Sequence, residues 1–468
     1  MQNIREKDVG ATFAYDADGK LAVAKMASYD RIGRKTRQWV IYTMPGMPAV
    51  ELSYEYNQSD ELIHSTFGEW DASASAFVPR AGRYRNYDAA GRLLKIEDEN
   101  HKNIATYVYT KNGNVKSKSY YDKGVLVYKK TIIRDVHDRP KKIVYEDDSK
   151  LLFQDTIDYV TPLAGRIFKV EHTWKGLPGR GDVVRSVNYK YDADGRLIKA
   201  NGALSGEYAY EGPYGQMTRK KEGDTTVNYT YSNRDKYRPS GFNVNGSSPS
   251  GTEEYFLYDA AGNAWLDRHV NVAYRLNSAG LPEAAYALSA TAAEPTLDQV
   301  NSGNVADVSQ TMYMAYDEGG QRIWTAFRGA GVDEEFATMP GVGKYYAQHV
   351  SNDVGFTLTQ MDLVAGGFRD MNSGIAYYPV TDMQGNVRAY ASTGGLNGAI
   401  DYYAYGTSSE IVHGNVEDNK RWQGKEEDGS IRKLYFGSRY FDPFFGMWLT
   451  PDPAGDNLPT RTRTAAIR

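Results

Sequence analysis

The string Tyr-Asp-x-x-Gly occurs six times in this chain of 468 residues, and no other sequence feature constrains the fold as strongly. An Asp that follows the end of a strand caps a turn by accepting bonds from nearby backbone N–H groups. A Gly four residues after Tyr takes the positive φ that a short hairpin loop needs. A second strand then begins, as in 91–96 and 195–199. Each copy therefore predicts a β-hairpin.

The repeat fixes a first set of candidate residues, which form hairpin turns. In chain order these are Tyr15, Asp16, Gly19, Tyr29, Asp30, Gly33, Tyr87, Asp88, Gly91, Tyr191, Asp192, Gly195, Tyr258, Asp259, Gly262, Tyr316, Asp317 and Gly320. A ladder of ligand-binding rings is the functional interpretation of these residues. The structural interpretation is favoured, because the pattern recurs wherever a hairpin must turn.

Weaker copies fill the gaps between the full ones, so the hairpins predict one continuous sheet. They include Tyr109, Leu276 and Thr381 with Gly in place, and Tyr56 and Tyr231 with Asp where Gly would lie. A single hairpin cannot bury a core, whereas stacked neighbours can. The content of 38 Tyr and 46 Gly suits many short strands and tight turns. We expect an all-β protein made of a long curved antiparallel sheet, rather than the three domains that length alone suggests.

Two segments depart from this pattern of repeated hairpins. The Ala-rich stretch Glu283–Gln310 lacks strand alternation and predicts a small insertion, part helix and part loop. From about Tyr377 the chain becomes denser in aromatic residues. We therefore divide it into a repeat region, 1–376, a second region, 377–455, and an irregular tail, 456–468.

Several function classes find no support in the composition. The net charge of −4 argues against a broad nucleic-acid-binding face. The chain has no cysteine, which excludes disulfides and thiol chemistry. Its first residues contain no apolar segment typical of a signal peptide, and no run approaches the roughly 20 apolar residues of a membrane span. Its histidines are scattered singly, and no nucleotide or nucleophile motif is present, so we expect neither metal nor cofactor.

The C-terminal region contains four blocks in a distinctive order. They are 378–387 (YPVTDMQGNV), 402–406 (YYAYG), 421–428 (RWQGKEED) and 434–453 (LYFGSRYFDPFFGMWLTPDP). These blocks resemble the core domain of the RHS (rearrangement hot spot) family, and the Tyr-Asp-x-x-Gly units resemble its YD repeats. The residues that carry the core resemblance are Asp382, Gly385, Trp422, Gly424, Glu426, Asp428, Tyr435, Arg439, Tyr440, Asp442, Pro443, Trp448, Asp452 and Pro453.

The resemblance implies a sheet that spirals into a hollow shell. Such shells enclose a variable C-terminal polypeptide, typically a toxin of a bacterial delivery system, and the core domain closes one end. In many members the core is an aspartyl-type autoprotease framed by two Asp-Pro-x-Gly motifs. Localisation would be secreted or at the cell surface, within a larger protein.

This chain matches the first of those motifs at Asp452-Pro453-Ala454-Gly455 and has no second one. We therefore expect a toxin-less or truncated member that does not cleave itself and is no enzyme. Asp452 remains the best catalytic candidate and Asp442 the next, although Asp before Pro is usually a turn residue. Glu426, Glu427 and Asp428 could bind a cation, but a solvated loop is the favoured interpretation.

Three functions stay open from the sequence. The leading one is a structural shell whose partners are a toxin cargo or an upstream RHS segment. The others are a carbohydrate-binding adhesion protein, whose Tyr rings would line an open groove, and an active autoprotease. In the core region we expect a buried aromatic cluster of Trp422, Tyr435, Phe436, Tyr440, Phe441 and Trp448. Arg439 should bind a carboxylate, because an unpaired buried guanidinium is costly.

Overall fold

The structure is a computed structural model and is almost entirely β. It describes residues 7–15, 21–43, 46–148, 150–160, 165–212, 215–231, 238–246, 255–317, 319–329, 331–339, 341–348, 356–416 and 418–452. Within these residues the only α-helix is the short α1 (Leu297–Asn301), which begins with a capping box formed by Thr296 and Gln299. Two 3-10 turns, η2 (Val364–Gly366) and η3 (Trp422–Gly424), complete the helical content of the described chain.

The first sheet has 19 strands, each antiparallel to the next along the chain. Its strands are β1 (Lys7–Tyr15), β2 (Leu21–Tyr29), β3 (Lys35–Tyr42), β4 (Val50–Tyr56), β5 (Leu62–Asp71), β6 (Ala76–Tyr87), β7 (Leu93–Glu97), β8 (Asn103–Tyr109), β9 (Val115–Asp122), β10 (Val125–Arg134), β11 (Pro140–Glu146), β12 (Leu151–Tyr159), β13 (Ile167–Leu177), β14 (Gly181–Tyr191), β15 (Leu197–Gly202), β16 (Gly206–Glu211), β17 (Gln216–Glu222), β18 (Thr225–Tyr231) and β19 (Pro239–Val244).

The second sheet continues the same meander over 13 strands. They are β20 (Phe256–Tyr258), β21 (Ala264–Asp267), β22 (Val272–Leu276), β23 (Pro282–Leu288), β24 (Val308–Tyr316), β25 (Arg322–Gly329), β26 (Val332–Met339), β27 (Gly343–Gln348), β28 (Thr357–Asp362), β29 (Phe368–Asp370), β30 (Ala376–Thr381), β31 (Val387–Ser392) and β32 (Gly395–Asn397). A hairpin of β33 (Ala399–Tyr402) and β34 (Ser408–Val412) follows. The last sheet holds β35 (Glu426–Asp428), β36 (Lys433–Tyr435), β37 (Tyr440–Asp442) and β38 (Met447–Trp448).

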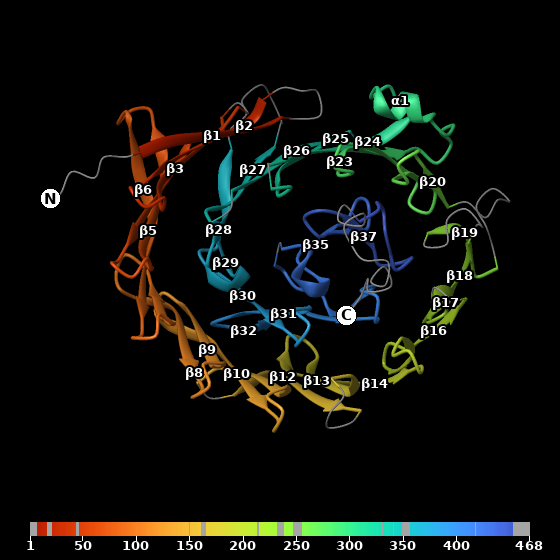
Figure 1. The fold of residues 1–468 in the computed structure, drawn as a ribbon, viewed down its shortest axis with the longest axis horizontal. Coiled ribbons are helices and arrows are strands. Elements are labelled where there is room, and N and C mark those ends of the chain that lie inside the picture. The colour runs from red at the N-terminus through yellow and green to blue at the C-terminus, as the bar shows by residue number, and fades with distance from the viewer. Residues whose placement is uncertain are drawn as a thin grey trace.

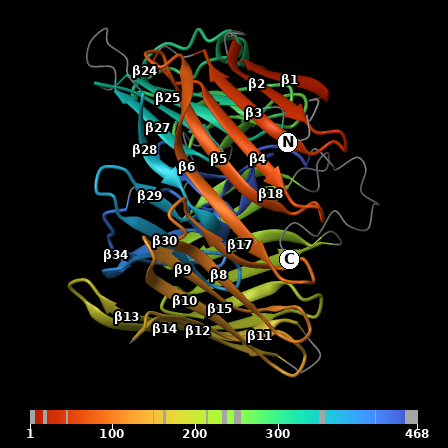
Figure 2. The same ribbon diagram turned by 90° about the vertical axis from the view of Figure 1, so that its left-hand side faces the viewer.

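The strip winds into a ring whose later strands lie inside its earlier ones. Figure 1 shows β1 to β26 round the circumference, β28 to β32 passing inside the first strands, and β35 and β37 near the centre. Figure 2 shows the wall from the side, with strands of the first sheet lying next to one another. The chain therefore encloses its own C-terminal region, a winding that agrees with the spiral implied by the resemblance.

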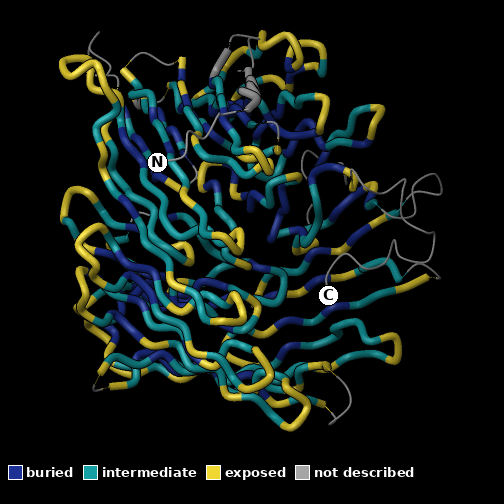
Figure 3. Tube along the Cα trace, turned by 60° about the vertical axis from the view of Figure 1, so that its left-hand side comes forward, coloured by how far each residue is buried: buried dark blue, intermediate teal, exposed yellow. Residues whose placement is uncertain are grey.

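Three cores hold the layers together. One joins β2–β5 to β24–β27, with Val50 and Phe67 against Ile323. A second joins β7–β13 to β30–β33, and Trp174 belongs to it. The third packs β18–β24 on the last sheet and includes Phe445. Exposed residues gather at the hairpin turns on the edges of the strip (Figure 3). Where two layers of the wall pack together, a strand can be buried on both faces of its sheet rather than on one.

The expectation for the Ala-rich segment is wrong in its first part. Residues 282–288 form β23 and residues from Val308 onward form β24, so an irregular segment with α1 occupies only 289–307. Strand alternation is missing because both faces of β23 are covered: Ala285 packs with the third core, and Ala284 and Tyr286 pack beneath α1. A strand buried on both faces has no polar side to display.

The sheet continues across the expected boundary near residue 376. β30 begins at Ala376 and pairs with β29 on one side and β31 on the other.

Among the described residues, no helix is long and apolar enough to cross a membrane.

Candidate functional site

The full repeat builds a compact turn in which one Asp organises both strands. In the second copy, Asp30 Oδ1 accepts bonds from the N–H groups of Ile32 and Arg34, and Gly33 lies at φ +88°. Asp30 Oδ2 binds Arg34 Nε at 2.6 Å, and the Arg34 guanidinium lies 4.9 Å over the ring of Tyr56. Those contacts lower the pKa of Asp30 although burial opposes them. The basic residue after Gly thus links one hairpin to the next.

The same geometry recurs at the other described copies. Gly91, Gly195, Gly262 and Gly320 all lie at positive φ, each donating its N–H to the carbonyl of the turn Asp. Asp88 and Asp192 bind the Arg four residues on, and Asp259 binds Asn263. Tyr15 ends β1 and Tyr191 ends β14, whereas Asp16 and Gly19 lie outside the described residues. These residues stabilise turns.

The tyrosines of the repeat tie neighbouring hairpins together. Tyr87 donates its hydroxyl to the carbonyl of Leu62 at 2.9 Å, and Tyr316 donates to Pro282 at 2.7 Å. In each case the accepting residue lies six positions after the last residue of the strand before it: Leu62 follows Tyr56 of β4, and Pro282 follows Leu276 of β22. No Tyr whose side chain the structure describes is exposed on the surface. Each of these described rings is therefore at least partly covered by its neighbours in the sheet.

The core-region residues form buried ion groups that face the wall, and the first involves Asp382. Asp382 caps the turn that contains Gly385 and binds Arg388 Nε at 2.9 Å. Arg388 also binds Asp401. Burial raises the pKa of Asp155 in the wall, which lies beside this group and binds His172 Nδ1 at 2.6 Å.

Gly385 and Gly424 are brought together by this turn. Both have positive φ, and a Cβ added to Gly424 would lie 3.5 Å from the carbonyl oxygen of Gly385. The 3-10 turn of Trp422–Gly424 is fixed there by Asn386 Oδ1, which accepts from Gln423 N.

The second group corrects the interpretation of 426–428 as a solvated loop. These residues form β35, and Arg322 from β25 binds Glu426 Oε2 at 2.8 Å and Asp428 Oδ2 at 2.5 Å. Lys344 lies 3.6 Å from Glu426. Burial opposes ionisation of Glu426, but Lys344 and Arg322 lower its pKa to about 2. The acidic run binds an arginine of the wall, so the carboxylates of Glu426 and Asp428 are already occupied.

The third group is the most deeply buried. Lys433 Nζ lies 2.8 Å from Asp267 Oδ2 and 2.7 Å from Asp442 Oδ2, and none of the three side chains is exposed. Burial raises the pKa of Asp267. Pro443, next to Asp442, is buried and its carbonyl accepts from Lys220. Asp442 is thus part of an ion triad between β21 and the last sheet.

Asp452 lies apart from Asp442 in its contacts. Its Oδ2 is 2.9 Å from Arg439 Nη2, and the Arg439 guanidinium lies 4.1 Å over the ring of Trp448. Arg439 therefore has the carboxylate expected for it. Pro453 lies outside the described residues.

The expected aromatic cluster exists as two clusters on opposite faces of the last sheet. Trp422, Phe436, Phe441 and Trp448 contact one another. Tyr435 and Tyr440 pack on each other and face Tyr316 of the wall. Alternation along β36 and β37 sends neighbouring rings to different faces.

Six charged partners were missed by the sequence interpretation: Asp155, His172, Asp267, Arg322, Arg388 and Lys433. Their only sequence signal is a charged residue among apolar neighbours in a short strand, as in Ala264–Asp267.

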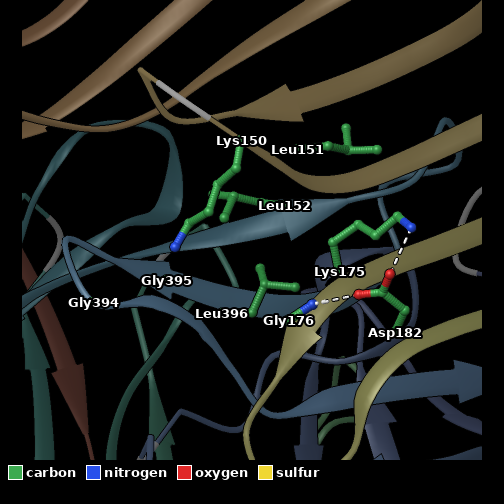
Figure 4. A pocket seen from close by; sticks show the side chains of 9 residues that line it. All are labelled: Lys150, Leu151, Leu152, Lys175, Gly176, Asp182, Gly394, Gly395 and Leu396. Atoms are coloured by element: carbon green, nitrogen blue, oxygen red, sulfur yellow. Dashed lines mark hydrogen bonds and ion pairs between the residues drawn. The ribbon is translucent and has the colours of Figure 1, made fainter.

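A surface pocket lies between the wall and the β31–β32 turn, and Figure 4 shows it. It has a volume of about 370 Å³ and is lined by Leu152 and Leu396, with Lys150 and Lys175 at its rim. Lys175 binds Asp182 at 2.7 Å.

The sequence matches no protein-family model and no curated protein. Solved structures do share its fold. TcdB2-TccC3 without its hypervariable C-terminal region is similar at a TM-score of 0.57 and 14% identity, covering 98% of this chain and 27% of that one. TcdB2-TccC3-TEV is similar at a TM-score of 0.57 and 13% identity, and the match covers 96% of this chain and 26% of that one.

The Photorhabdus luminescens Tc holotoxin pore carrying a TccC3 mutation is similar at a TM-score of 0.57 and 15% identity. The match covers 93% of this chain and 20% of that one. This chain thus spans 20–27% of the length of these three chains. At such low identity the likeness shows the fold, which is the RHS-like shell fold.

Proposed function

We propose that this chain is a structural shell segment that encloses a polypeptide joined after its C-terminal region, as RHS shells enclose a toxin. One observation carries the proposal: the chain approaches its last described residues on the inner side of the wall. Leu449 is buried and its carbonyl accepts the N–H of Ala264 in β21 at 2.8 Å. A polypeptide that continues past Asp452 therefore starts inside the ring.

The buried ion groups support this role. Each joins a strand of the wall to a strand of the enclosed region: Arg185 and Asp401, Arg322 and Asp428, Asp267 and Lys433. Buried pairs fix one arrangement of two surfaces, because misplacing either charge leaves the other unpaired. The contacts of Asp442 and Asp452 with cations likewise support a structural role over a catalytic one. In this proposal the chain works outside the producing cell, as part of a larger protein.

Protease protection tests the proposal. A short unstructured peptide with a single protease site is fused after residue 468, and in a matched protein the same peptide is fused before residue 1. We expect the C-terminal peptide to be cut at least tenfold more slowly than the N-terminal one. Equal rates of cleavage, in a protein whose thermal unfolding is unchanged, would contradict enclosure.

A further inference from the structure

Lys433 differs in its chemistry from the other cations that lie between two carboxylates. Arg322 and Arg388 carry guanidinium groups, which stay protonated in proteins, whereas a lysine can release a proton and become a nucleophilic amine. Lys433 Nζ lies 2.8 Å from one carboxyl oxygen and 2.7 Å from another, and none of the three side chains is exposed. A lysine is therefore enclosed, away from solvent, with two groups that it could acylate itself on.

Asp267 is held as the acyl group of this triad. Its Oδ1 accepts the N–H groups of His269 at 2.9 Å and Val270 at 3.3 Å, and its Oδ2 lies against Lys433 Nζ. Two N–H groups on one carbonyl oxygen are the arrangement that stabilises a tetrahedral acyl intermediate. Burial raises the pKa of Asp267, and Asp442 adds to the rise, although Lys433 opposes it. The rise favours the protonated carboxyl group, which can lose its hydroxyl as water.

Asp442 is placed to accept the proton of the ammonium group. Its Oδ1 accepts the N–H of Phe445 at 3.0 Å, which fixes the carboxylate, and its Oδ2 lies against Lys433 Nζ. A general base needs this reach to the proton that it removes. Burial lowers the pKa of Lys433, but Asp267 and Asp442 outweigh burial and raise it. The ion triad is therefore the resting form, and a reaction through the free amine is slow.

The surroundings of the triad favour a neutral product. Tyr274 and Phe445 are fully buried, and Phe256 pairs with Asp267 across β20 and β21. Ions in such a core carry a desolvation cost that a neutral amide does not. Groups fixed in contact also react far more readily than the same groups free in water.

We infer that the triad is the site of an intramolecular amide bond between Lys433 Nζ and Asp267 Cγ. Asp442 takes a proton from the ammonium group, and the amine attacks Cγ of protonated Asp267. The Nζ–Cγ bond forms, the Cγ–Oδ2 bond breaks, and the hydroxyl leaves with a proton as water. The products are one amide, one water molecule and a protonated Asp442, so the net charge stays zero. The amide joins β21 of the wall to β36 of the last sheet, whether or not a cargo is enclosed.

Mass spectrometry of the purified full chain tests the inference, after incubation of the folded protein at neutral pH and subsequent denaturation. We expect a species lighter than the parent by one water molecule, whose fraction rises with the time of incubation. A trypsin digest should contain a branched peptide that joins the segments of Asp267 and Lys433, because trypsin does not cut after an acylated lysine. The exposed pair of Lys175 and Asp182, 2.7 Å apart, is the control within the same digest and should give no branched peptide.

Two variants separate the roles of the carboxyl groups. Asp267→Asn should give the same branched peptide with loss of ammonia in place of water, since a side-chain amide is also an acyl group. Asp442→Asn should slow formation at least tenfold, because it removes the proton acceptor. Thermal unfolding establishes that each variant is folded.

The parent protein decides whether the amide forms, even if a variant does not fold. Absence of the branched peptide from the incubated folded parent would overturn the inference. An equal yield from the parent kept unfolded in urea would do the same, since the reaction would then owe nothing to the triad. Formation by folded Asp442→Asn at the rate of the parent would remove Asp442 from the proposed step.

Discussion

Lys433 Nζ lies 2.7 Å from Asp442 Oδ2, and neither side chain is exposed to solvent. Asp267 of the wall completes the triad at 2.8 Å from the same ammonium group. One cation between two carboxylates leaves the group short of positive charge, so burial keeps the pKa of Asp267 raised even though Lys433 opposes it. The triad is the point at which the wall and the last sheet depend most on each other.

Replacement of this lysine should be severe. Lys433→Met leaves two carboxylates without a cation in an apolar core, and we expect a loss of about 3–5 kcal/mol in the free energy of unfolding. Urea denaturation at pH 7 measures it. Lys116→Met, on an exposed site of β9, should change stability by no more than about 0.5 kcal/mol.

A combined variant separates charge from packing. Lys433→Met with Asp267→Asn and Asp442→Asn removes the uncompensated charges and should recover much of the lost stability. A loss below about 1 kcal/mol in the single variant would mean that the triad contributes little to holding the layers.

The pair of Arg322 and Glu426 should give a distinct pH dependence. The pKa of Glu426 is about 2 in the folded chain, against an ordinary value of 4.5. A lowered pKa means that the stabilisation is fully present above about pH 5 and is lost as the pH falls through 2. At pH 7 we expect Glu426→Gln to cost about 2–4 kcal/mol.

Denaturation curves of the parent and Glu426→Gln at several pH values check this. The two proteins should approach equal stability as the pH falls from 5 towards 2. Glu410→Gln, a largely exposed carboxylate on β34, is the control and should follow the parent. A difference that is independent of pH would show that Glu426 acts through packing rather than charge.

Local chemistry explains why the turns could be predicted from the sequence. Asp30, Gly33 and their equivalents act within five residues, so the string itself contains the turn and its handedness. The carboxylate partner of Arg439 could be expected on general grounds, because a guanidinium in an aromatic cluster needs one. Nothing beyond the neighbouring residues enters either argument.

The second layer could not be predicted in the same way. Whether Glu426 meets solvent or Arg322 depends on how far the strip has turned by residue 322, and this angle accumulates over many strands. The same winding decides which face of β37 meets Tyr316, so a single expected ring cluster became two. It also covers β23 on both sides and thereby removes the alternation that would have identified it as a strand.

The hairpin turns provide a test free of packing effects. Gly113 lies at φ +83°, and a Cβ added there would meet nothing within 4 Å. Gly113→Ala should therefore cost about 1–2 kcal/mol through backbone conformation alone. Gly165→Ala is the matched control: it is equally uncrowded, its φ lies outside the positive range, and it should be neutral or slightly stabilising. Equal effects of the two changes, measured by thermal unfolding, would contradict the assigned turn.

Trp448 should matter more than the ion pair beside it. Trp448→Ala removes ring contacts with Phe436 and Phe441 and the surface under Arg439, and we expect a loss of about 3 kcal/mol. Asp452→Asn should cost less than about 1 kcal/mol, because the Asp452 side chain is 42% exposed and the pair is screened by solvent. If chemical denaturation showed a larger loss of stability for Asp452→Asn than for Trp448→Ala, the ion pair and not the ring would be the main stabilising contact here.

Self-cleavage is the remaining test, and we expect none. Aspartyl chemistry needs two carboxyl groups that share a proton at a site shielded from water. Asp452 binds the guanidinium of Arg439, and its side chain is substantially exposed, so it is not shielded from water. Asp442 is bound to Lys433 in a different group. The purified chain should keep its mass of 52.3 kDa on incubation between acid and neutral pH, in the parent and in Asp452→Asn alike. An intact-mass spectrum with a discrete product cut near Leu458 in the parent, absent in Asp452→Asn, would show that the chain is an autoprotease after all.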